Sequence, residues 1–436
     1  MSPRDPALTT PKTIALPTTP QRPPRTALDV ATPALADPER APAPHLYIHV
    51  PFCFHKCHYC DFYSIVDTRG RQPAFTARLE RELAALSPLA HDPHGTPAPL
   101  RTVFVGGGTP TLLSPALWRD LLRTLDERYD LSAIRRGEAG TEFSVECNPE
   151  TATRELFDML REGGVNRLSI GAQSFNPAHL KTLERWHNPA NVGRAVEMAR
   201  RAGIERVSAD LIFAIPGQTM REWLDDLRCA LDLGVEHTSC YALTFEPGTA
   251  MTRRMELGRF EPADEDLELE MMRATRETLA AHGLHRYEVS NFARPGRESA
   301  HNLAYWRQAD WLAAGPSASG HLGGRRWKNA PRLDDYLTID EDGFAPITDH
   351  EAPEPRRNLV EAIMTGLRLT EGLDAGVYLA RAEAIDGVTG ARLRAAAALQ
   401  VSEGLMTDCD GHWTLTERGV ELTNRVVRAL MDAVDP

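Results

Sequence analysis

The chain has 436 residues, 42% of them hydrophobic, and a formal net charge of −12 at pH 7. This length suits one large α/β barrel with an accessory domain, or two or three domains, and the apolar content is enough for a sizeable core. The acidic balance argues against bulk binding to nucleic acid or to an anionic membrane surface, because both favour basic proteins.

Residues 1–44 are expected to form a disordered tail. They are rich in Pro, Thr and Ala and poor in aromatic residues, so they cannot bury enough apolar surface to offset chain entropy. A transit peptide is the alternative, and the acidic residues disfavour it. We find neither a signal-peptide pattern nor an apolar run long enough to span a bilayer. Together with seven cysteines, an odd number, these features predict a cytoplasmic protein with reduced thiols.

Residues 45–345 alternate between strand-like and helix-like segments. Short apolar runs typical of strands lie at 46–50, 102–105, 142–146, 166–171, 206–213 and 237–243. Amphipathic segments follow them, and in one of these Ser114 is placed to cap a helix that begins at Pro115. Apolar strands followed by helices indicate parallel strands covered by helices. Six such units favour a partial (β/α)6-type barrel, with a doubly wound open sheet as the alternative.

Residues 346–436 lose this alternation. A helical stretch, "EPRRNLVEAIMTGLRLTEGL", is followed over 402–431 by a strand, a turn at Asp410–Gly411, a second strand and a helix. This pattern predicts a small winged-helix-like α+β domain. Because no strong basic cluster accompanies it, we favour a packing or lid role over DNA binding.

Three cysteines follow the first predicted strand. Cys53, Cys57 and Cys60 have the spacing C-x3-C-x2-C and would lie at the C-terminal mouth of a barrel, where barrel enzymes place their sites. Thiolates suit iron–sulfur clusters and zinc. Three thiolates on a cubane would leave the fourth iron open to a small molecule, as open metal sites do in catalysis. The histidines that could instead complete a zinc site are His49, His55 and His58.

Polar groups also occur at or after the ends of later strands. The turn "FVGGGTPT" has three glycines, which let a backbone approach a ligand closely, and Glu146, Gln173, Arg185 and Asp210 follow along the chain. An acidic residue in an apolar strand must be paired or face a polar cavity. Taken singly, each residue is more often structural, but their shared position predicts one pocket for an amino-acid-like or nucleoside ligand.

Five motifs in order resemble radical S-adenosylmethionine (SAM) proteins of the oxygen-independent coproporphyrinogen III oxidase-like family. They are "YIHVPFCFHKCHYCDF", "GGGTPT", "SVECNPE", "GVNRLSIGAQSF" and "DLIFAIPGQT". The resemblance extends from about residue 45 to the C-terminus. It implies a [4Fe–4S] cluster on Cys53, Cys57 and Cys60, with SAM at the open iron. It also implies one-electron reduction of the SAM sulfonium, which yields methionine and a 5′-deoxyadenosyl radical. The implied SAM-contacting residues are Tyr47, Gly107, Gly108, Thr109, Glu146, Gln173, Arg185, Asp210 and Ala242.

Within this family the chain looks like the haem chaperone branch. The oxidases carry a further cysteine two residues past the third, where this chain has Phe62, and the Pro-rich tail has no recognisable oxidase substrate segment. The stretch "HNLAYW" at 301–306 matches the HNxxYW pattern of that branch. It implies that His301 is an axial ligand to haem iron, with flat apolar contacts from Tyr305 and Trp306. A half-buried aromatic pair with a histidine cap is the structural alternative.

The expected function is therefore haem binding and transfer to haem proteins by a chain that carries a cluster and SAM. Whether SAM is cleaved stays open. The alternatives are the porphyrinogen oxidase, which Phe62 disfavours, and a related radical SAM methyltransferase that shares the HNxxYW pattern. Expected partners are haem, haem-accepting proteins and an electron donor, whereas a homodimer and a peripheral membrane contact through acceptors stay open. The cysteines outside the motif are expected to be apolar fillers; they are Cys147, Cys229, Cys240 and Cys409.

Overall fold

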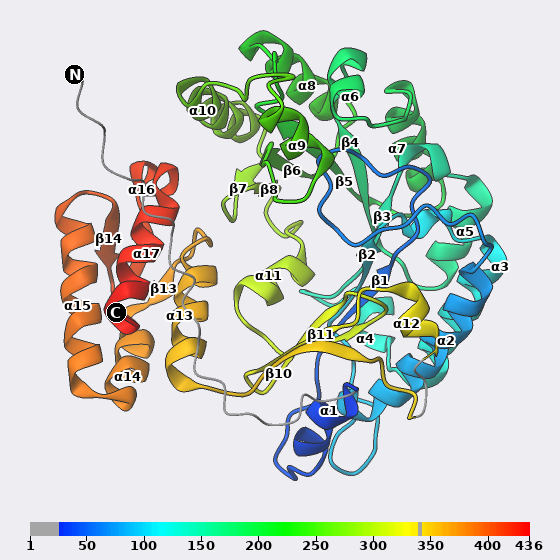
Figure 1. The fold of residues 1–436 in the computed structure, drawn as a ribbon, viewed down its shortest axis with the longest axis horizontal. Coiled ribbons are helices and arrows are strands. Elements are labelled where there is room, and N and C mark those ends of the chain that lie inside the picture. Colours follow the sequence, from blue (N-terminus) through cyan, green and yellow to red (C-terminus); the bar gives the residue numbers. More distant parts are fainter. Residues whose placement is uncertain (1–25, 339–341) are drawn as a thin grey trace, which may run out of the picture.

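The computed structural model describes residues 26–338 and 342–436. A large curved sheet with helices along its outer side forms the main part, and a smaller, mostly helical domain lies at its open side (Figure 1). No helix in these two ranges is long and apolar enough to cross a membrane.

Twelve strands form the large sheet. They are β1 (His45–Val50), β2 (Thr102–Gly107), β3 (Glu142–Cys147), β4 (Arg167–Gln173), β5 (Arg206–Phe213), β6 (His237–Ala242), β7 (His285–Arg286), β8 (Asn291–Ala293), β9 (Trp311–Ala314), β10 (Ser319–Leu322), β11 (Arg325–Asn329) and β12 (Ile347–Glu351). Their order is β12-β11-β10-β9-β1-β2-β3-β4-β5-β6-β8-β7. Because β1 to β6 are parallel neighbours in chain order, without the reversal of a doubly wound sheet, the predicted partial barrel is confirmed. The sheet is open, because β1 continues into β9 and β6 into β8.

The outer face of the parallel strands is covered by helices. The long ones are α2 (Gln72–Leu86), α3 (Pro115–Arg128), α5 (Arg154–Glu162), α7 (Ala190–Arg201), α8 (Met220–Asp232) and α10 (Glu265–Ala281). The main part also contains the shorter helices α4 (Ser132–Arg135), α6 (Pro177–Thr182), α9 (Ala250–Glu256) and α12 (Leu333–Thr338), with 3-10 turns η1 (Ser87–Ala90), η2 (Pro110–Leu112) and η3 (Pro149–Thr151). Helix α11 (Ala300–Trp306) lies instead on the inner side of the sheet (Figure 1). The predicted cap of α3 is present, because Ser114 accepts a hydrogen bond from Leu117 N.

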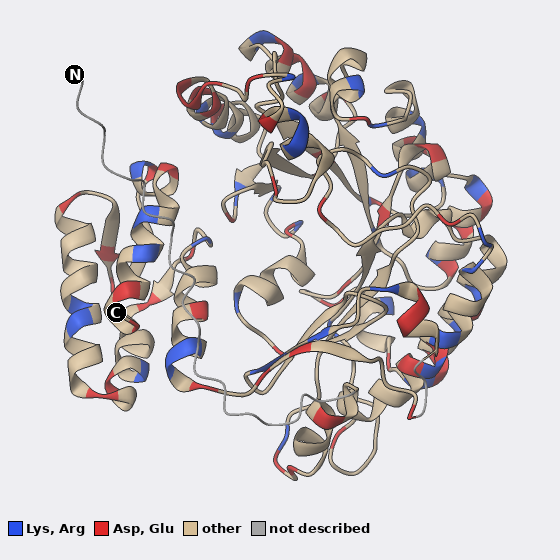
Figure 2. Cartoon of the chain, viewed as in Figure 1, with Lys and Arg blue, Asp and Glu red and all other residues tan. Residues whose placement is uncertain are grey.

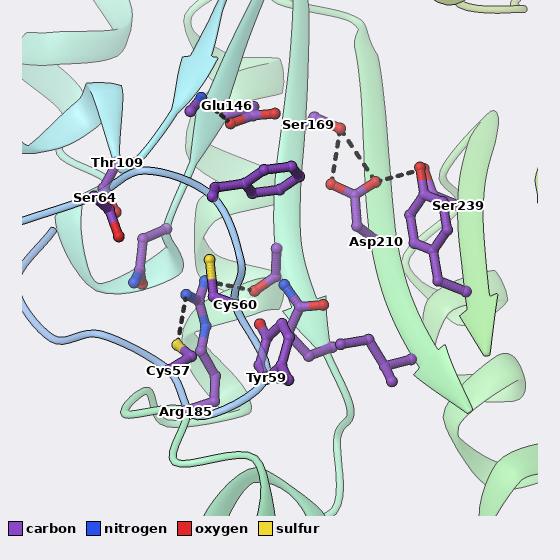
Figure 3. Close-up of a pocket in the computed structure, with 18 of the residues that line it drawn as sticks. Cys57, Tyr59, Cys60, Ser64, Thr109, Glu146, Ser169, Arg185, Asp210 and Ser239 are labelled. Carbon is purple, nitrogen blue, oxygen red and sulfur yellow. Dashed lines mark hydrogen bonds between the residues drawn. The ribbon is translucent and has the colours of Figure 1, made fainter. Parts of the chain in front are cut away.

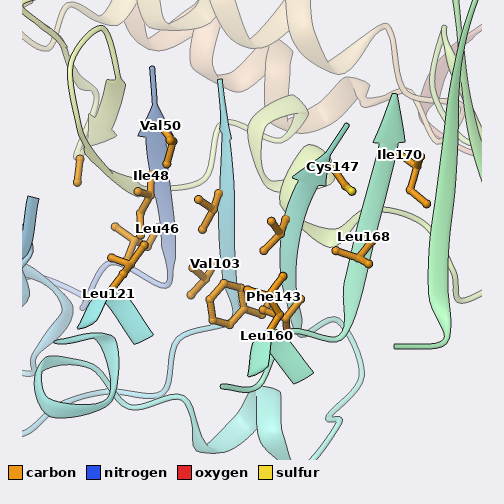
Figure 4. Close-up of a cluster of buried hydrophobic side chains, with 14 of the residues drawn as sticks. Leu46, Ile48, Val50, Val103, Leu121, Phe143, Cys147, Leu160, Leu168 and Ile170 are labelled. Atoms are coloured by element: carbon orange, nitrogen blue, oxygen red, sulfur yellow. The ribbon is translucent and has the colours of Figure 1, made fainter. Parts of the chain in front are cut away.

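Side chains alternate between the two faces of each parallel strand. On β1, Leu46, Ile48 and Val50 are fully buried against the outer layer (Figure 4), where they join residues such as Leu121 and Phe143 in the main core. On β2 to β6, the side chains that face the inner side of the sheet are mostly polar. They include Thr102, Glu142, Glu146, Arg167, Ser169, Ser208, Asp210, His237 and Ser239. The outer face therefore forms the apolar core, and the inner face is mostly polar.

The second domain has its own core and topology. Its elements are α13 (Pro355–Gly366), β13 (Leu373–Asp374), α14 (Ala375–Ile385), α15 (Gly387–Ser402), β14 (Met406–Cys409), β15 (His412–Leu415), α16 (Glu417–Glu421) and α17 (Thr423–Val434). The sheet order is β13-β15-β14. The predicted hairpin is present, and Asp410 and Gly411 at its turn both have positive φ, 53° and 78°. This fits a two-residue hairpin turn.

Two expectations about local structure were wrong. Residues 26–44, expected to be disordered, include α1 (Leu28–Leu35), where Val30 and Ala31 are buried in the main core and the Ala27 amide bonds the Ala345 carbonyl. Long-range packing thus orders a segment of low intrinsic preference; residues 1–25 lie outside the described residues. Cys147 and Cys240 are buried fillers as expected, but Cys229 and Cys409 are exposed.

Candidate functional site

The cysteine loop begins where β1 ends and is fixed at both sides. Cys53 N donates to Ile65 O at 2.9 Å, and Ile65 N donates to Pro51 O at 2.7 Å, so the loop is closed at its base. Further out, Met251 N at the start of α9 donates to His58 O at 2.9 Å. The segment that carries the three thiols is therefore held by its own base and by α9.

The glycine-rich turn after β2 packs directly on this loop. Gly108 N donates to Val50 O at 2.8 Å, and Thr109 N donates to Phe52 O at 2.7 Å. Gly107 has φ +104°, and a Cβ there would lie 2.4 Å from the His49 ring. The glycines are thus required by close contacts within the protein. The sequence alone suggests only that they let the backbone approach a ligand.

A cavity of about 690 Å³ opens between these two turns and the later strand ends. Its volume lies in the range of small-molecule sites. Most of the sequence-predicted site residues line it: Cys53, Cys57, Cys60, Gly107, Gly108, Thr109, Glu146, Gln173, Arg185, Asp210 and Ala242. We call this the cysteine cavity. Tyr47 and His301 do not line it but face a neighbouring cavity.

The three thiols and a guanidinium all line the cysteine cavity. Figure 3 shows two of the thiols, Cys57 and Cys60, beside Arg185. Arg185 Nη1 donates to Cys57 Sγ at 3.8 Å and Nη2 to Gly171 O at 3.1 Å, while Thr109 Oγ1 donates to Cys53 Sγ at 3.6 Å. Burial raises the pKa of the Cys60 thiol to about 11, so ligation by its thiolate must release a proton. Positive charge and hydroxyl donors beside sulfur favour the thiolate form that iron binds.

The donor set fits an iron–sulfur cubane. Among the described residues, no three His, Cys, Asp or Glu side chains converge closely enough to hold a single ion. A cubane needs no such convergence, because each thiolate binds a different iron of the cluster. Three thiols from one loop, on the wall of a cavity with room beyond them, match that requirement.

Two carboxylates lie across the cysteine cavity from the thiols. Glu146 Oε2 accepts a hydrogen bond from Gly107 N at 2.9 Å. Burial first, and then the charge of Asp210, raise the pKa of Glu146 to about 7 despite that bond. Asp210 accepts hydrogen bonds from the hydroxyls of Ser169 and Ser239 (Figure 3) and from that of Ser208. The inner face can thus accept hydroxyl or amine hydrogens from a ligand.

Gln173 reaches the cavity through a bulge at the end of β4. Its φ is +61°, and the β4–β5 register shifts between Gly171 and Gln173. Asp226 of α8 accepts from Ser174 Oγ and Phe175 N, both at 2.6 Å, which fixes the chain just beyond the bulge. Bulges beside sites commonly re-aim a side chain in this way.

A second cavity of about 430 Å³ adjoins the first, and we call it the aromatic cavity. The two share Asp61, Phe62, Phe104, Glu146 and Asn302 as lining residues. The other residues lining the aromatic cavity are Tyr47, His49, Tyr63, His301, Tyr305, Trp311, Ser317, Ser319 and Lys328. Trp306, expected to offer a flat face here, does not line this cavity, and Trp311 of β9 does. The sequence spacing could not distinguish the two because β9 pairs with β1 only in the folded sheet.

His301 is 1% exposed and stacks on Phe104, with ring centroids 5.2 Å apart. Its Nδ1 hydrogen-bonds Thr102 Oγ1 at 2.6 Å, whereas its buried Nε2 has no hydrogen-bond partner within the part of the chain that the structure describes. Burial, with a smaller effect of the nearby His45, holds the pKa of His301 well below its ordinary value, so the imidazole is neutral. A neutral imidazole with a free nitrogen is a metal-ligand form.

The helix that carries His301 is anchored by a residue that sequence analysis missed. Glu142, fully buried at the start of β3, accepts from Ser299 Oγ at 3.1 Å and Ala300 N at 3.0 Å at the start of α11. The same carboxylate lies 3.2 Å from Arg206 and 3.9 Å from Arg167. Its place as the first residue of a predicted strand, with polar residues at every second position after it, was the available signal.

The comparisons with known proteins agree with this geometry. Residues 47–230 match the family model described as the radical SAM superfamily. The chain is 35% identical over 391 residues to "Heme chaperone HemW" of Bacillus subtilis, covering 88% of this chain and 98% of the relative, and 31% identical over 398 residues to that of Escherichia coli, covering 90% and 99%. This chain therefore belongs to the HemW family of radical SAM proteins, as its motifs predicted.

A solved structure extends the fold comparison. Coproporphyrinogen III oxidase (HemN) from Escherichia coli superposes with a TM-score of 0.77 at 24% identity, covering 95% of this chain and 96% of that one. The similarity shows that the barrel and the second domain occur together in both proteins.

Proposed function

We propose that this chain binds haem and transfers it to haem proteins, while carrying a [4Fe–4S] cluster and SAM. Family membership supports the proposal, because the relatives are named heme chaperones. The observation that carries it is His301, whose buried Nε2 has no hydrogen-bond partner among the described residues and which lines an aromatic cavity next to the three thiols.

In this proposal the cluster is held by Cys53, Cys57 and Cys60. When bound, it supplies an electron to the sulfonium of SAM at its open iron. Arg185 stabilises the thiolate of Cys57 through the contact between its guanidinium and the sulfur. The loop remains in place because its base and α9 hold its backbone.

SAM would occupy the cysteine cavity beyond the thiols. Glu146 and Asp210 would accept hydrogen bonds from its hydroxyl or amino groups, and the turn at Gly107, Gly108 and Thr109 would bind it through the backbone. Gln173, Arg185 and Ala242 line the same cavity. Tyr47 would contact SAM from the aromatic cavity, which Tyr47 and Glu146 both line. The serines on Asp210 orient its carboxylate.

Haem would enter the aromatic cavity with its iron toward His301. Donation of the Nδ1 proton to Thr102 would leave the Nε2 lone pair for the iron. Tyr305 and Trp311, whose ring centroids are 4.5 Å apart, would cover the macrocycle as apolar surface. The cavity adjoins the cysteine cavity through Phe104 and Asn302, so both cofactors would be within one inner chamber.

A haem titration of the anaerobically reconstituted protein tests this proposal. The wild type is expected to bind haem saturably with a defined Soret band, and His301→Ala to shift that band and weaken binding. His282→Ala is the control, because His282 is exposed at the end of α10. Identical spectra and affinities for wild type and His301→Ala would remove His301 from the proposal. Haem transfer is then measured by the absorbance of an apo-haem protein mixed with the loaded chain.

Oxidase activity is the competing function, and it has a separate assay. Phe62, 60% exposed on the wall that the two cavities share, stands where the oxidases resembled here have a further cysteine. The reconstituted protein with coproporphyrinogen III, SAM and a reductant is expected to form no protoporphyrinogen. Catalytic turnover in this assay would replace the chaperone proposal with the oxidase.

A further inference from the structure

Lys328 is the one Lys or Arg residue among the described residues that line the aromatic cavity. The chain has 49 Lys and Arg residues, and four of them are lysines, at 12, 56, 181 and 328. Charged residues of both signs are interspersed along the outer helices (Figure 2). Lys328 instead lies on β11, opposite Ser319 of β10, and both residues line the aromatic cavity.

The ammonium of Lys328 has no partner within hydrogen-bonding or salt-bridge distance among residues 26–338 and 342–436. Asp349 lies opposite it in the β11–β12 register, yet no salt bridge joins them. Asp61 lines the same cavity but also makes no ion pair with it. Glu146, the second acid on this wall, makes no ion pair with it either. Lys328 is exposed to solvent at the edge of the cavity, so its ammonium is free to meet a charged group on a ligand.

The nearby imidazole also leaves this charge unsatisfied. His49 bonds Tyr63 O through Nε2 at 2.9 Å and Tyr47 Oη through Nδ1 at 3.1 Å, so both of its ring nitrogens are occupied. Burial lowers the pKa of His49 to about 4, and the charge of Lys328 adds to that effect. The ammonium therefore has no free acceptor on His49, although both residues line the same cavity.

An aromatic cavity with one unpaired cation at its wall fits a flat apolar ligand that carries a carboxylate at its edge. An ammonium acts on a carboxylate as a point charge, and a hydrogen bond between two charged groups is stronger than a neutral one. We propose that Lys328 binds a propionate carboxylate of the tetrapyrrole and selects macrocycles that have a free acid there. This inference rests on the proposed haem function and adds the group that recognises the edge of the ligand.

The test compares haem with haem dimethyl ester, which keeps the iron and the ring but has no free carboxylate. Both are titrated into the reconstituted wild type, Lys328→Met, Lys328→Arg and Lys181→Met. The quantity compared is the ratio of the two dissociation constants, ester over free acid. Lys181 is the matched control, because it is exposed on α6 and lines neither cavity.

Lys328→Met is expected to lower that ratio about 2- to 5-fold, the range for an exposed charge pair. Lys328→Arg should keep most of the ratio, and Lys181→Met should keep all of it. An unchanged ratio in Lys328→Met overturns the inference. The His301→Ala spectrum tests the proposed iron ligand independently, because loss of that ligand should weaken acid and ester alike. Absence of saturable haem binding to the wild type would overturn both proposals.

Discussion

Removing the carboxylate of Glu142 should loosen the helix that carries His301. Glu142 is fully buried and accepts hydrogen bonds from Ser144 Oγ at 2.7 Å, from Ser299 Oγ and from Ala300 N. It also neutralises Arg167 and Arg206, whose side chains are 3% and 17% exposed. Glu142→Ala therefore leaves two buried guanidinium groups without their anion and α11 without its anchor.

The expected loss of unfolding free energy is about 3–5 kcal/mol, the range for breaking a buried ion pair from one side. Glu142→Gln keeps an oxygen acceptor but loses the charge, so it should cost about 1.5–3 kcal/mol, typical of hydrogen bonds to charged groups. The matched control is Glu138→Ala. Glu138 pairs with Arg136 at the surface, with side chains 44% and 58% exposed, and should cost within about 0.5 kcal/mol.

Urea denaturation followed by tryptophan fluorescence measures these differences, because Trp306 ends α11 and Trp311 begins β9. Hydrogen exchange of the α11 amides adds a local measurement, and their protection should fall in Glu142→Ala before that of β1. An unfolding free energy of Glu142→Ala within about 1 kcal/mol of that of Glu138→Ala would show that Glu142 does not anchor α11. Wild-type hydrogen-exchange protection of the α11 amides in Glu142→Ala would show the same.

Three further predictions concern the cysteine cavity. Cys57→Ala should lose most of its iron and acid-labile sulfide and the reduced-state EPR signal, whereas Cys229→Ala, at an exposed position, should keep them. Glu146→Gln should remove a pH dependence: with a folded pKa of about 7 against an ordinary 4.5, the folded wild type retains a proton that the unfolded chain releases. Its stability should therefore fall by up to about 3 kcal/mol, relative to the variant, as pH rises from 4.5 through 7. Gly107→Ala should destabilise the chain by about 2–4 kcal/mol, because φ is +104° and the new Cβ meets a ring. Gly137→Ala, at φ +66° with no atom within 4 Å, should cost about 1 kcal/mol.

Each of these predictions has a contrary result. Stoichiometric zinc and no iron in anaerobically purified wild type would refute the cluster assignment itself. Parallel stability–pH curves for wild type and Glu146→Gln would mean that Glu146 titrates normally in the fold. Equal unfolding midpoints for Gly107→Ala and Gly137→Ala in urea would show that the turn can move away from β1.

The two cavities explain why Phe62 matters in either version of the function. It is exposed, and it lies on the wall that both cavities share. A thiol at this position would face both cavities, whereas a phenyl ring presents only apolar surface to them. Phe62 therefore leaves no thiol at the junction of the two cavities.

The sequence by itself determined the features that depend on neighbouring residues. The strands from β1 to β6, the cap at Ser114, the hairpin at Asp410–Gly411 and the three thiols in one loop all follow from local periodicity, turn chemistry and spacing. The positions of Glu146 and Asp210 in their strands were equally readable, because alternation assigns each residue to a face. The family motifs occupy these same local segments.

Only the tertiary structure decided which distant residues meet. Thr102 and His301, 199 residues apart, share a hydrogen bond because α11 lies on the concave side of the sheet against β2. Trp311 lines the aromatic cavity because β9 pairs with β1. Such contacts depend on sheet register and helix placement, which are set by summed packing across the whole chain and not by any one segment. The helix α1 forms for the same reason, through burial against the main core.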